Sequence, residues 1–359
     1  MKFGYRVSLP IIIVALIIAG IILLARPVFI DHSAENGPKP SSSEPIVLVW
    51  ELAGIESDYD SIGPMEPVEV VSPTWFHLSS AKGEIRSDFD PEYLDWARER
   101  GYQVWALVTN SFDPDLTASL LSNAELRRQF AGDLVKLAVK YELEGLNIDF
   151  ENFHKDYRDH FTLLVQELAA LCKEYNLVLS VNITMISGSE YWSQGYDRAK
   201  LAAAADYLVL MAYDEHWASS PNAGSVASLP WVEQGLKLIL NDVPSEKLIL
   251  GVPFYTRLWE IDESTDPATV LNSWSYSMMR AEEIIANNQA EIYSDDHAGQ
   301  NVAEYKKEGL TYRMWLEDKG SMQKRLELID KYNLAGVAAW RRGLEKHEIW
   351  EIFKTFLGG

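Results

Sequence analysis

Eight short runs of apolar, β-branched or aromatic residues recur along the chain, and segments with a helical period lie between most of them. Strands that alternate with helices form parallel sheets, and eight such units suit a closed α/β barrel of the (β/α)8 type. An open, doubly wound sheet is the alternative. The runs are Ile46–Glu51, Val70–Leu78, Gln103–Asn110, Gly145–Glu151, Leu177–Thr184, Tyr207–Asp214, Lys247–Tyr255 and Gly336–Arg341.

The interval between the seventh and eighth runs is too long for one crossover. Residues 260–316 contain a helical segment, Met278–Asn287, and short strand-like pieces, which predict a small α+β insertion in a barrel that spans residues 45–359. The clearest helical periods elsewhere are Pro91–Arg100, Asn123–Tyr141, Tyr157–Tyr175, Leu229–Asn241 and Ser321–Tyr332.

The N-terminal segment predicts export. A charge-free apolar run of about 17 residues, Leu9–Ala25, follows Lys2 and Arg6, so the first eight residues should stay in the cytoplasm. We expect residues 9–25 to form a transmembrane signal anchor, with a cleaved signal peptide as the alternative. Residues 26–44 are rich in Pro, Gly and Ser and indicate a flexible linker. The expected location is the cell membrane with the barrel domain outside the cytoplasm, or else secretion.

Composition narrows the partners. A net charge of −21 argues against nucleic acid, which needs basic patches. The single cysteine, Cys172, allows no internal disulfide and lies on an apolar helical face, so we expect it in the core. Histidines show no metal-ligand spacing, so we expect no metal and no cofactor. The 12 Trp and 17 Tyr suit sugar stacking, although aromatic residues also fill cores. We expect a monomer.

The run from Gly145 to Glu151 has an unusual polar face. Apolar residues alternate in it with Asn147, Asp149 and Glu151, and residues two apart on a strand point the same way, roughly 6.5–7 Å apart. In a barrel strand the apolar face would meet the helices and the polar row would enter the barrel. Crowded carboxylates cannot all ionise freely, so at least one pKa should rise. An edge strand with a solvated face, or a purely structural role for Asp149, is the alternative.

Other strand ends are also rich in chemistry. Catalytic residues of such barrels lie at the C-terminal ends of the strands. Acids, a Tyr–Asp pair and a Trp that converge on one mouth suit glycosidic cleavage. Tyr213 and Trp340 are core aromatics in the alternative interpretation. These end residues are Asp149 and Glu151, Met211, Tyr213 and Asp214, Tyr255 and Arg257, and Trp340.

At these residues the chain resembles glycoside hydrolase family 18, the chitinase-like barrels. The family signature Asp-Gly-x-Asp-x-Asp-x-Glu stands here as Glu144-Gly145-Leu146-Asn147-Ile148-Asp149-Phe150-Glu151. Further stretches are similar to the spore-germination branch, the cortical-fragment lytic N-acetylglucosaminidases. They are Ser72–Phe76, Val104–Asn110, Tyr213–Trp217, Pro253–Arg257 and Gly336–Arg341.

The resemblance implies roles for these residues. Glu151 falls on the catalytic acid/base, Asp149 on the residue that orients the acetamido group of the substrate, and Tyr213 on the residue that bonds the acetamido carbonyl. It implies a retaining, substrate-assisted hydrolase of β-linked N-acetylglucosamine glycans, either peptidoglycan fragments or chitin oligomers. The substrate-binding residues would be Asn147, Met211, Asp214, Tyr255, Arg257 and Trp340.

Two departures from the signature matter. Asn147 replaces the first acid of the strand and Glu144 replaces the outer Asp, and an Asn cannot share a proton with Asp149. The alternative function is a catalytically inactive, lectin-like sugar-binding barrel. Because the acid Glu151 is present, we favour the enzyme.

Overall fold

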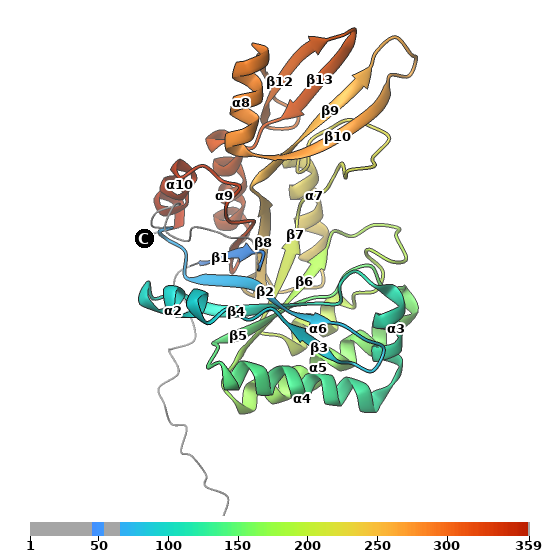
Figure 1. Cartoon of the computed structure of the whole chain (residues 1–359), viewed down its shortest axis with the longest axis vertical. Coiled ribbons are helices and arrows are strands. Elements are labelled where there is room, and N and C mark those ends of the chain that lie inside the picture. Colours follow the sequence, from blue (N-terminus) through green and yellow to red (C-terminus); the bar gives the residue numbers. More distant parts are fainter. Residues whose placement is uncertain (1–44, 54–64, 358–359) are drawn as a thin grey trace, which may run out of the picture. The chain divides into compact units, whose positions relative to one another are not determined.

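The computed structural model describes residues 45–53 and 65–357. Within them, eight parallel strands pair side by side in the order β1-β14-β8-β7-β6-β5-β4-β2, and β1 pairs with β2 to close the barrel (Figure 1). The predicted (β/α)8 barrel is confirmed and the open sheet is wrong. The strands are β1 (Ile46–Glu51), β2 (Val70–Leu78), β4 (Gln103–Thr109), β5 (Gly145–Asp149), β6 (Val178–Thr184), β7 (Tyr207–Met211), β8 (Leu248–Pro253) and β14 (Gly336–Trp340), and the short β3 (Ile85–Ser87) pairs antiparallel with β2.

Helices connect the strands, and polar residues begin several of them. The side chains of Asp90, Asp113 and Asn123 each accept hydrogen bonds from two backbone N–H groups of the following first turn. The helices are α2 (Pro91–Glu99), α3 (Pro114–Ser122), α4 (Ala124–Lys140), α5 (Arg158–Glu174), α6 (Arg198–Ala204), α7 (Leu229–Ile239), α9 (Lys319–Tyr332) and α10 (Glu348–Leu357), with 3-10 turns η1 (Lys155–Tyr157) and η2 (Ser245–Lys247).

The barrel strands bury both faces, and the two faces differ in partners. Along β5, Leu146 and Ile148 join the large apolar cluster between strands and helices, which continues through Phe150. The side chain of Asn147 points the other way, to Trp50 of β1 across the barrel. The expectation that the apolar face of this strand meets the helices is therefore confirmed. Cys172 is buried in the same outer cluster, also as expected.

A five-stranded antiparallel sheet stands between β8 and β14 in the sequence. Its strands run in the order β10-β9-β13-β12-β11, and α8 packs on it through a small apolar cluster that includes Leu258, Ala281 and Met314 (Figure 1). The elements are β9 (Tyr255–Asp262), β10 (Thr269–Ser277), α8 (Met278–Asn288), β11 (Glu291–Asp295), β12 (Gln300–Lys307) and β13 (Leu310–Trp315).

Strand β5 ends earlier than predicted. It stops at Asp149, so Glu151 lies in the loop that follows instead of in the strand. The side chain of Asn110 explains the early end. Its Oδ1 accepts from the Glu151 N–H at 3.0 Å, and its Nδ2 donates to the Glu151 carbonyl at 2.6 Å. An amide side chain therefore takes the place of a neighbouring strand at this residue.

Two other runs also end early. Strand β7 stops at Met211, so Tyr213 and Asp214 lie beyond it, and Asp214 has a positive φ of 60°. Strand β8 stops at Pro253, and the Phe254 N–H makes the last bond to β14 by donating to the Trp340 carbonyl at 2.7 Å. Tyr255 and Arg257 therefore belong to β9, the first strand of the inserted sheet, and not to the seventh barrel strand.

The predicted anchor at residues 9–25, the N-terminal segment 1–8 and the linker 26–44 lie outside the described residues. Among the helices of the described part, none combines the length and the apolar character that a membrane span requires.

Candidate active site

Asn147 and Asp149 are buried side by side on the inner face of β5. Both contact Asn182 of β6, which lies between them. The Asn147 Nδ2 donates to the Asn182 Oδ1 at 2.8 Å, and the Asn182 Nδ2 donates to the Asp149 Oδ1 at 2.9 Å. The inner polar row predicted from the sequence therefore exists for its first two members, with a partner that the sequence did not reveal.

Glu151 follows two residues later and is held by its backbone. Asn110 bonds both the N–H and the carbonyl of Glu151, and the Asn110 Nδ2 also donates to the Thr117 hydroxyl at 2.8 Å. The Tyr196 hydroxyl donates to the carbonyl of Phe150 at 2.8 Å, between the two acids. Because these hydrogen bonds hold the backbone of Phe150 and Glu151 in place, the Glu151 side chain starts from a fixed position near Asp149.

Burial sets the ionisation of the two acids. It raises the pKa of Asp149 to about 6, although the hydrogen bond from Asn182 lowers that pKa. Burial also raises the pKa of Glu151 well above its usual range, and the charges of Asp149 and Asp214 raise it further. Neither Asp149 nor Glu151 forms an ion pair with a described residue. At neutral pH the pair therefore favours a proton on Glu151 and a carboxylate on Asp149.

Tyr213 and Asp214 approach the acids from the loop after β7. Their contacts come from the inserted sheet: the Tyr255 hydroxyl donates to the Asp214 Oδ1 at 2.5 Å, and the Arg257 Nη2 lies 3.3 Å from the same oxygen. The rings of Tyr213 and Tyr255 meet edge to face at 6.3 Å. Burial and the charges of Glu151 and Asp149 raise the pKa of Tyr213 well above its usual range, so its hydroxyl stays a donor.

Trp340 ends β14 and packs inside the barrel cluster. Its ring lies 5.8 Å from that of Trp50, at an angle of 61°. Met211 is buried in the same cluster, and Tyr213 packs against it. Because Trp50 also donates to Asn147, Trp340 is linked through one residue to the polar row of β5.

These side chains offer a partly buried protonated acid, a neighbouring carboxylate, a tyrosine hydroxyl and an indole on one barrel, which is a set suited to acid-catalysed glycoside cleavage. The model of the family described as glycosyl hydrolases family 18 matches residues 110–345. The chain belongs to glycosyl hydrolase family 18. The enzyme class predicted from the sequence, a glycosidase, is confirmed.

Relatives of this family 18 chain include proteins of the spore-former Bacillus subtilis. It is 26% identical to the uncharacterized glycosylase YvbX over 76% of this chain and 80% of that protein. It is 29% identical to the putative sporulation-specific glycosylase YdhD, over 74% and 64% of the two chains. The cortical fragment-lytic enzyme is 24% identical, over 68% and 57%. The resemblance to the spore lytic branch is therefore confirmed, although the chain spans less than two thirds of the last two proteins.

Solved structures agree on the fold. A chitinase of Chromobacterium violaceum superposes with a TM-score of 0.78 at 23% identity, over 88% of this chain and 99% of that chain. The spore cortex-lytic enzyme SleL of Bacillus megaterium gives a TM-score of 0.78 at 19% identity, over 89% and 76% of the two chains. At these identities the comparison establishes the fold alone.

Four residues of this family 18 barrel escaped the sequence analysis. Asn182 stands out in the sequence only as the first residue of Asn182-Ile183-Thr184, a glycosylation sequon, but it is 2% exposed and therefore inaccessible to a glycan. The other three form hydrogen bonds over long sequence separations: Asn110 with Glu151, Tyr196 with Phe150, and Trp50 with Asn147. Only the position of Asn110 and Trp50 at predicted strand ends offered a signal for them.

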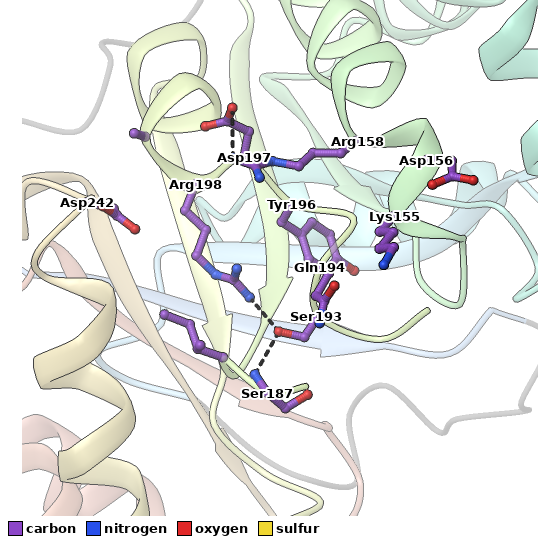
Figure 2. Close-up of a pocket in the computed structure, with 12 residues that line it drawn as sticks. Lys155, Asp156, Arg158, Ser187, Ser193, Gln194, Tyr196, Asp197, Arg198 and Asp242 are labelled. Atoms are coloured by element: carbon purple, nitrogen blue, oxygen red, sulfur yellow. Dashed lines mark hydrogen bonds and ion pairs between the residues drawn. The ribbon is translucent and has the colours of Figure 1, made fainter. Parts of the chain in front are cut away.

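A hollow of about 730 Å³ lies beside the connection from β6 to α6, and none of the predicted site residues lines it. Figure 2 shows Arg198 directed toward Ser193, whose hydroxyl it contacts at 3.2 Å, with Tyr196 nearby. An ion pair of 3.1 Å joins Arg158 and Asp197 at the same hollow. Neither Asp149 nor Glu151 lines the hollow, whereas Tyr196, which bonds the Phe150 carbonyl between these two acids, does.

Proposed function

We propose that this protein is a retaining glycoside hydrolase that cleaves β-linked N-acetylglucosamine glycans with the help of the acetamido group of the substrate. The observation that carries the proposal is the pair Asp149 and Glu151. They stand two residues apart, both have raised pKa values, and neither is paired with a described cation.

The chemistry divides among three side chains. Glu151 donates its proton to the glycosidic oxygen as the bond to the anomeric carbon breaks. The acetamido carbonyl oxygen of the same sugar attacks that carbon and closes an oxazolinium ring, which water then opens while Glu151 takes back a proton. Asp149 accepts from the acetamido N–H and stabilises the positive charge that develops there. Tyr213 donates to the acetamido carbonyl and holds it in position.

Substrate assistance removes the need for an enzymic nucleophile. Retaining enzymes of the two-carboxylate type place their nucleophile about 5–5.5 Å from the acid. Here the carboxylate beside the acid, Asp149, already accepts a hydrogen bond from Asn182 on its Oδ1. Holding an internal nucleophile in a reactive pose supplies several kcal/mol, roughly the lower end of the intramolecular advantage.

Product stereochemistry and inhibition test this mechanism. We expect the initial product to keep the β configuration when followed by proton NMR, and we expect a thiazoline analogue of the oxazolinium to inhibit. Glucose polymers without the 2-acetamido group should not be cleaved. A sugar ester trapped on Asp149, or inversion at the anomeric carbon, would show that the mechanism is wrong.

Both candidate substrates contain N-acetylglucosamine. Cortical fragment-lytic relatives favour peptidoglycan fragments, and chitinases are also among the similar proteins. We propose peptidoglycan fragments first. Mass spectrometry of products from purified cortex fragments and from chitin oligomers separates the two, with Glu151→Gln as the blank. Binding of either glycan without any turnover by the native chain would favour the lectin-like alternative.

Exposed aromatic rings support an extended glycan. Phe112, in the loop after β4, and Trp192, in the loop after β6, are 50% and 45% exposed, and their rings lie 6.3 Å apart. Trp217, in the loop after β7, is 51% exposed. These loops follow the C-terminal ends of strands on both sides of β5, where rings can stack on sugar units.

Trp340 is proposed as the ring beneath the reacting sugar. Trp340→Ala removes the indole and admits water, so we expect KM to rise about tenfold, together with a lower kcat. Isothermal titration of an oligosaccharide with Glu151→Gln, alone and combined with Trp340→Ala, measures the binding part. Equal affinities in the two proteins would make Trp340 a core residue only.

For location, we propose that residues 9–25 anchor the barrel outside the cytoplasm. The charge difference around this segment, with Lys2 and Arg6 before it, motivates the proposal. Protease added to intact cells should remove the barrel, and a cytoplasmic marker protein should survive as the control. Full protection of the barrel in cells with a permeable wall would contradict it.

A further inference from the structure

A chain of hydrogen bonds crosses the barrel interior and ends on Asp149. The Trp50 Nε1 donates to the Asn147 Oδ1 at 2.9 Å, Asn147 donates to Asn182 at 2.8 Å, and Asn182 donates to Asp149 at 2.9 Å. The four side chains are 0%, 0%, 2% and 6% exposed in the same order. They come from β1, β5 and β6, so the chain exists only in the folded barrel.

The indole determines the direction of the whole chain. A tryptophan N–H can only donate, so Asn147 must present its oxygen to Trp50 and its NH2 group to Asn182. Asn182 must then present its oxygen to Asn147, which leaves its NH2 group for Asp149. The orientation of both amides therefore follows from chemistry, even though the O and N atoms of an amide have nearly the same shape.

We propose that Asn182 is a positioning residue, which the Trp50–Asn147 pair orients so that it donates a permanent N–H to the inner oxygen of Asp149. This inference rests on the proposed function, because the proposed mechanism requires Asp149 as a charged carboxylate that is oriented toward the acetamido N–H. In the family signature an acid stands at the place of Asn147 and can share a proton with the acid at Asp149. Here the hydrogen-bond chain supplies a fixed N–H donor to Asp149 instead. Any proton that Asp149 gains must then sit on its other oxygen.

The groups around Asp149 show why a donor is needed there. Two other acids lie at this end of the barrel: Glu151 in the loop after β5, and Asp214 in the loop after β7, whose charge acts on Glu151. The tyrosines nearby are Tyr196, Tyr213 and Tyr255, and burial, followed by the charges of the neighbouring acids, raises the pKa of each. The cation in this group, Arg257, forms its ion pair with Asp214 and not with Asp149. Asn182 is therefore the group that stabilises the carboxylate form of Asp149 directly.

The hydrogen-bond chain also predicts an unexpected effect of Asn147→Asp, the substitution that introduces the acid of the family signature. A carboxylate at residue 147 still accepts from Trp50, but it repels the oxygen of Asn182. Asn182 then turns its NH2 group toward residue 147 and its oxygen toward Asp149. That oxygen disfavours the carboxylate form of Asp149, so we expect the family-like residue to lower kcat, by about tenfold or more.

The first experiment needs no substrate. It compares the unfolding of the full chain and of Asn182→Leu from pH 4 to pH 8, with Ser180→Ala as the matched control. Ser180 accepts a second hydrogen bond from Asn147 but is not in the chain to Asp149. When a carboxyl has a higher pKa in the folded than in the unfolded state, the free energy of unfolding of the protein decreases as pH increases from the unfolded to the folded pKa. Without its donor the pKa of Asp149 rises further, so Asn182→Leu should lose additional stability between about pH 5 and 8.

Ser180→Ala should differ from the native protein by the same amount at every pH. A stability difference for Asn182→Leu that does not depend on pH would overturn the proposal. If Asn182→Leu fails to fold, Trp50→Phe takes its place. It keeps an aromatic ring but removes the indole N–H that orients both amides, so the same pH-dependent loss is expected at a smaller size.

The second experiment measures the pH profile of kcat/KM on the glycan that the product analysis identifies. We expect the rising limb of Asn182→Leu to lie about one pH unit or more above that of the native enzyme. The free energy of a hydrogen bond to a charged group corresponds to a pKa shift of about one unit or more. Unchanged limbs in Asn182→Leu would contradict the proposal. Should the native chain show no turnover, the unfolding series still decides the role of Asn182, so the failure of the proposed function is distinguished from the failure of this inference.

Discussion

Acids at the mouth of the barrel and acids on the inserted sheet have opposite ionisation behaviour. Asp149 is buried and Glu151 is partly buried, neither has a described cation as partner, and the pKa values of both are raised. On the inserted sheet, Glu260 accepts from the Tyr312 hydroxyl, and Glu263, just after β9, accepts from the Thr311 hydroxyl at 2.9 Å and lies 3.2 Å from Arg313. These partners lower the pKa of Glu260 and of Glu263. The same residue types therefore become reactive in one region and permanently charged in the other.

Glu317 shows which of the two factors is stronger. It is buried like Asp149, but it forms an ion pair of 2.5 Å with the buried Arg325 of α9. Burial nevertheless raises the pKa of Glu317 to about 6. A single cation does not fully offset burial, since desolvation acts on the charged form throughout the low-dielectric interior. Burial is thus the main cause of raised pKa values here, and the absence of a cation increases the effect at the active site.

The substitution Glu151→Gln should have the largest effect, and it tests whether the acids at the barrel mouth are the reactive ones. The amide keeps the shape of the side chain but cannot donate a proton to the glycosidic oxygen, so we expect kcat to fall on the order of 10²–10⁴-fold or more. Circular dichroism should show an unchanged fold. Near-normal turnover would mean that the acid lies elsewhere on the barrel.

Asp149→Asn tests the neighbouring carboxylate. The amide oxygen still accepts from Asn182 but carries no charge to stabilise the developing oxazolinium, so we expect kcat to fall about 10²-fold. KM for an oligosaccharide should change much less, because the aromatic surface is untouched. A loss that appears in KM alone would reduce Asp149 to a binding residue.

The pH profile of the native enzyme sharpens the comparison. Asp149 must be ionised and Glu151 protonated, so kcat/KM should rise through the pKa of Asp149, about 6, and fall only above the raised pKa of Glu151. One pH unit below the rising midpoint the rate should be about tenfold lower. Steady-state assays from pH 4 to 9 check both limbs. Full activity at pH 4 would exclude an essential carboxylate at residue 149.

The smallest effect is expected on the inserted sheet. Glu260→Gln removes a charge whose two partners, the Tyr312 hydroxyl and the Asn272 amide, are neutral groups on a partly exposed surface, so stability should change by about 0–1 kcal/mol. We expect kcat to change less than twofold. Thermal unfolding and a single-substrate assay are sufficient measurements, and a tenfold loss of kcat would show that this sheet takes part in the reaction.

The sequence alone predicted the barrel and the region of its site. Eight strands, the sheet between the last two, and the inward polar row at Asn147 and Asp149 follow from local periodicity and from chain length, which are properties of neighbouring residues. The family signature on one strand pointed to Glu151 and Asp149. None of this needed knowledge of which strands lie side by side.

Tertiary structure decided the electrostatics. Strand β5 stops at Asp149 because Asn110, 41 residues earlier, bonds the backbone of Glu151. Tyr255 and Arg257 reach Asp214 from the inserted sheet, and Asn182 reaches Asp149 from 33 residues away. Burial and hydrogen bonds across strands set the charge of an acid, and both depend on groups that only folding brings together. Local pattern therefore names the acids, and the closed barrel determines which of them carries the proton.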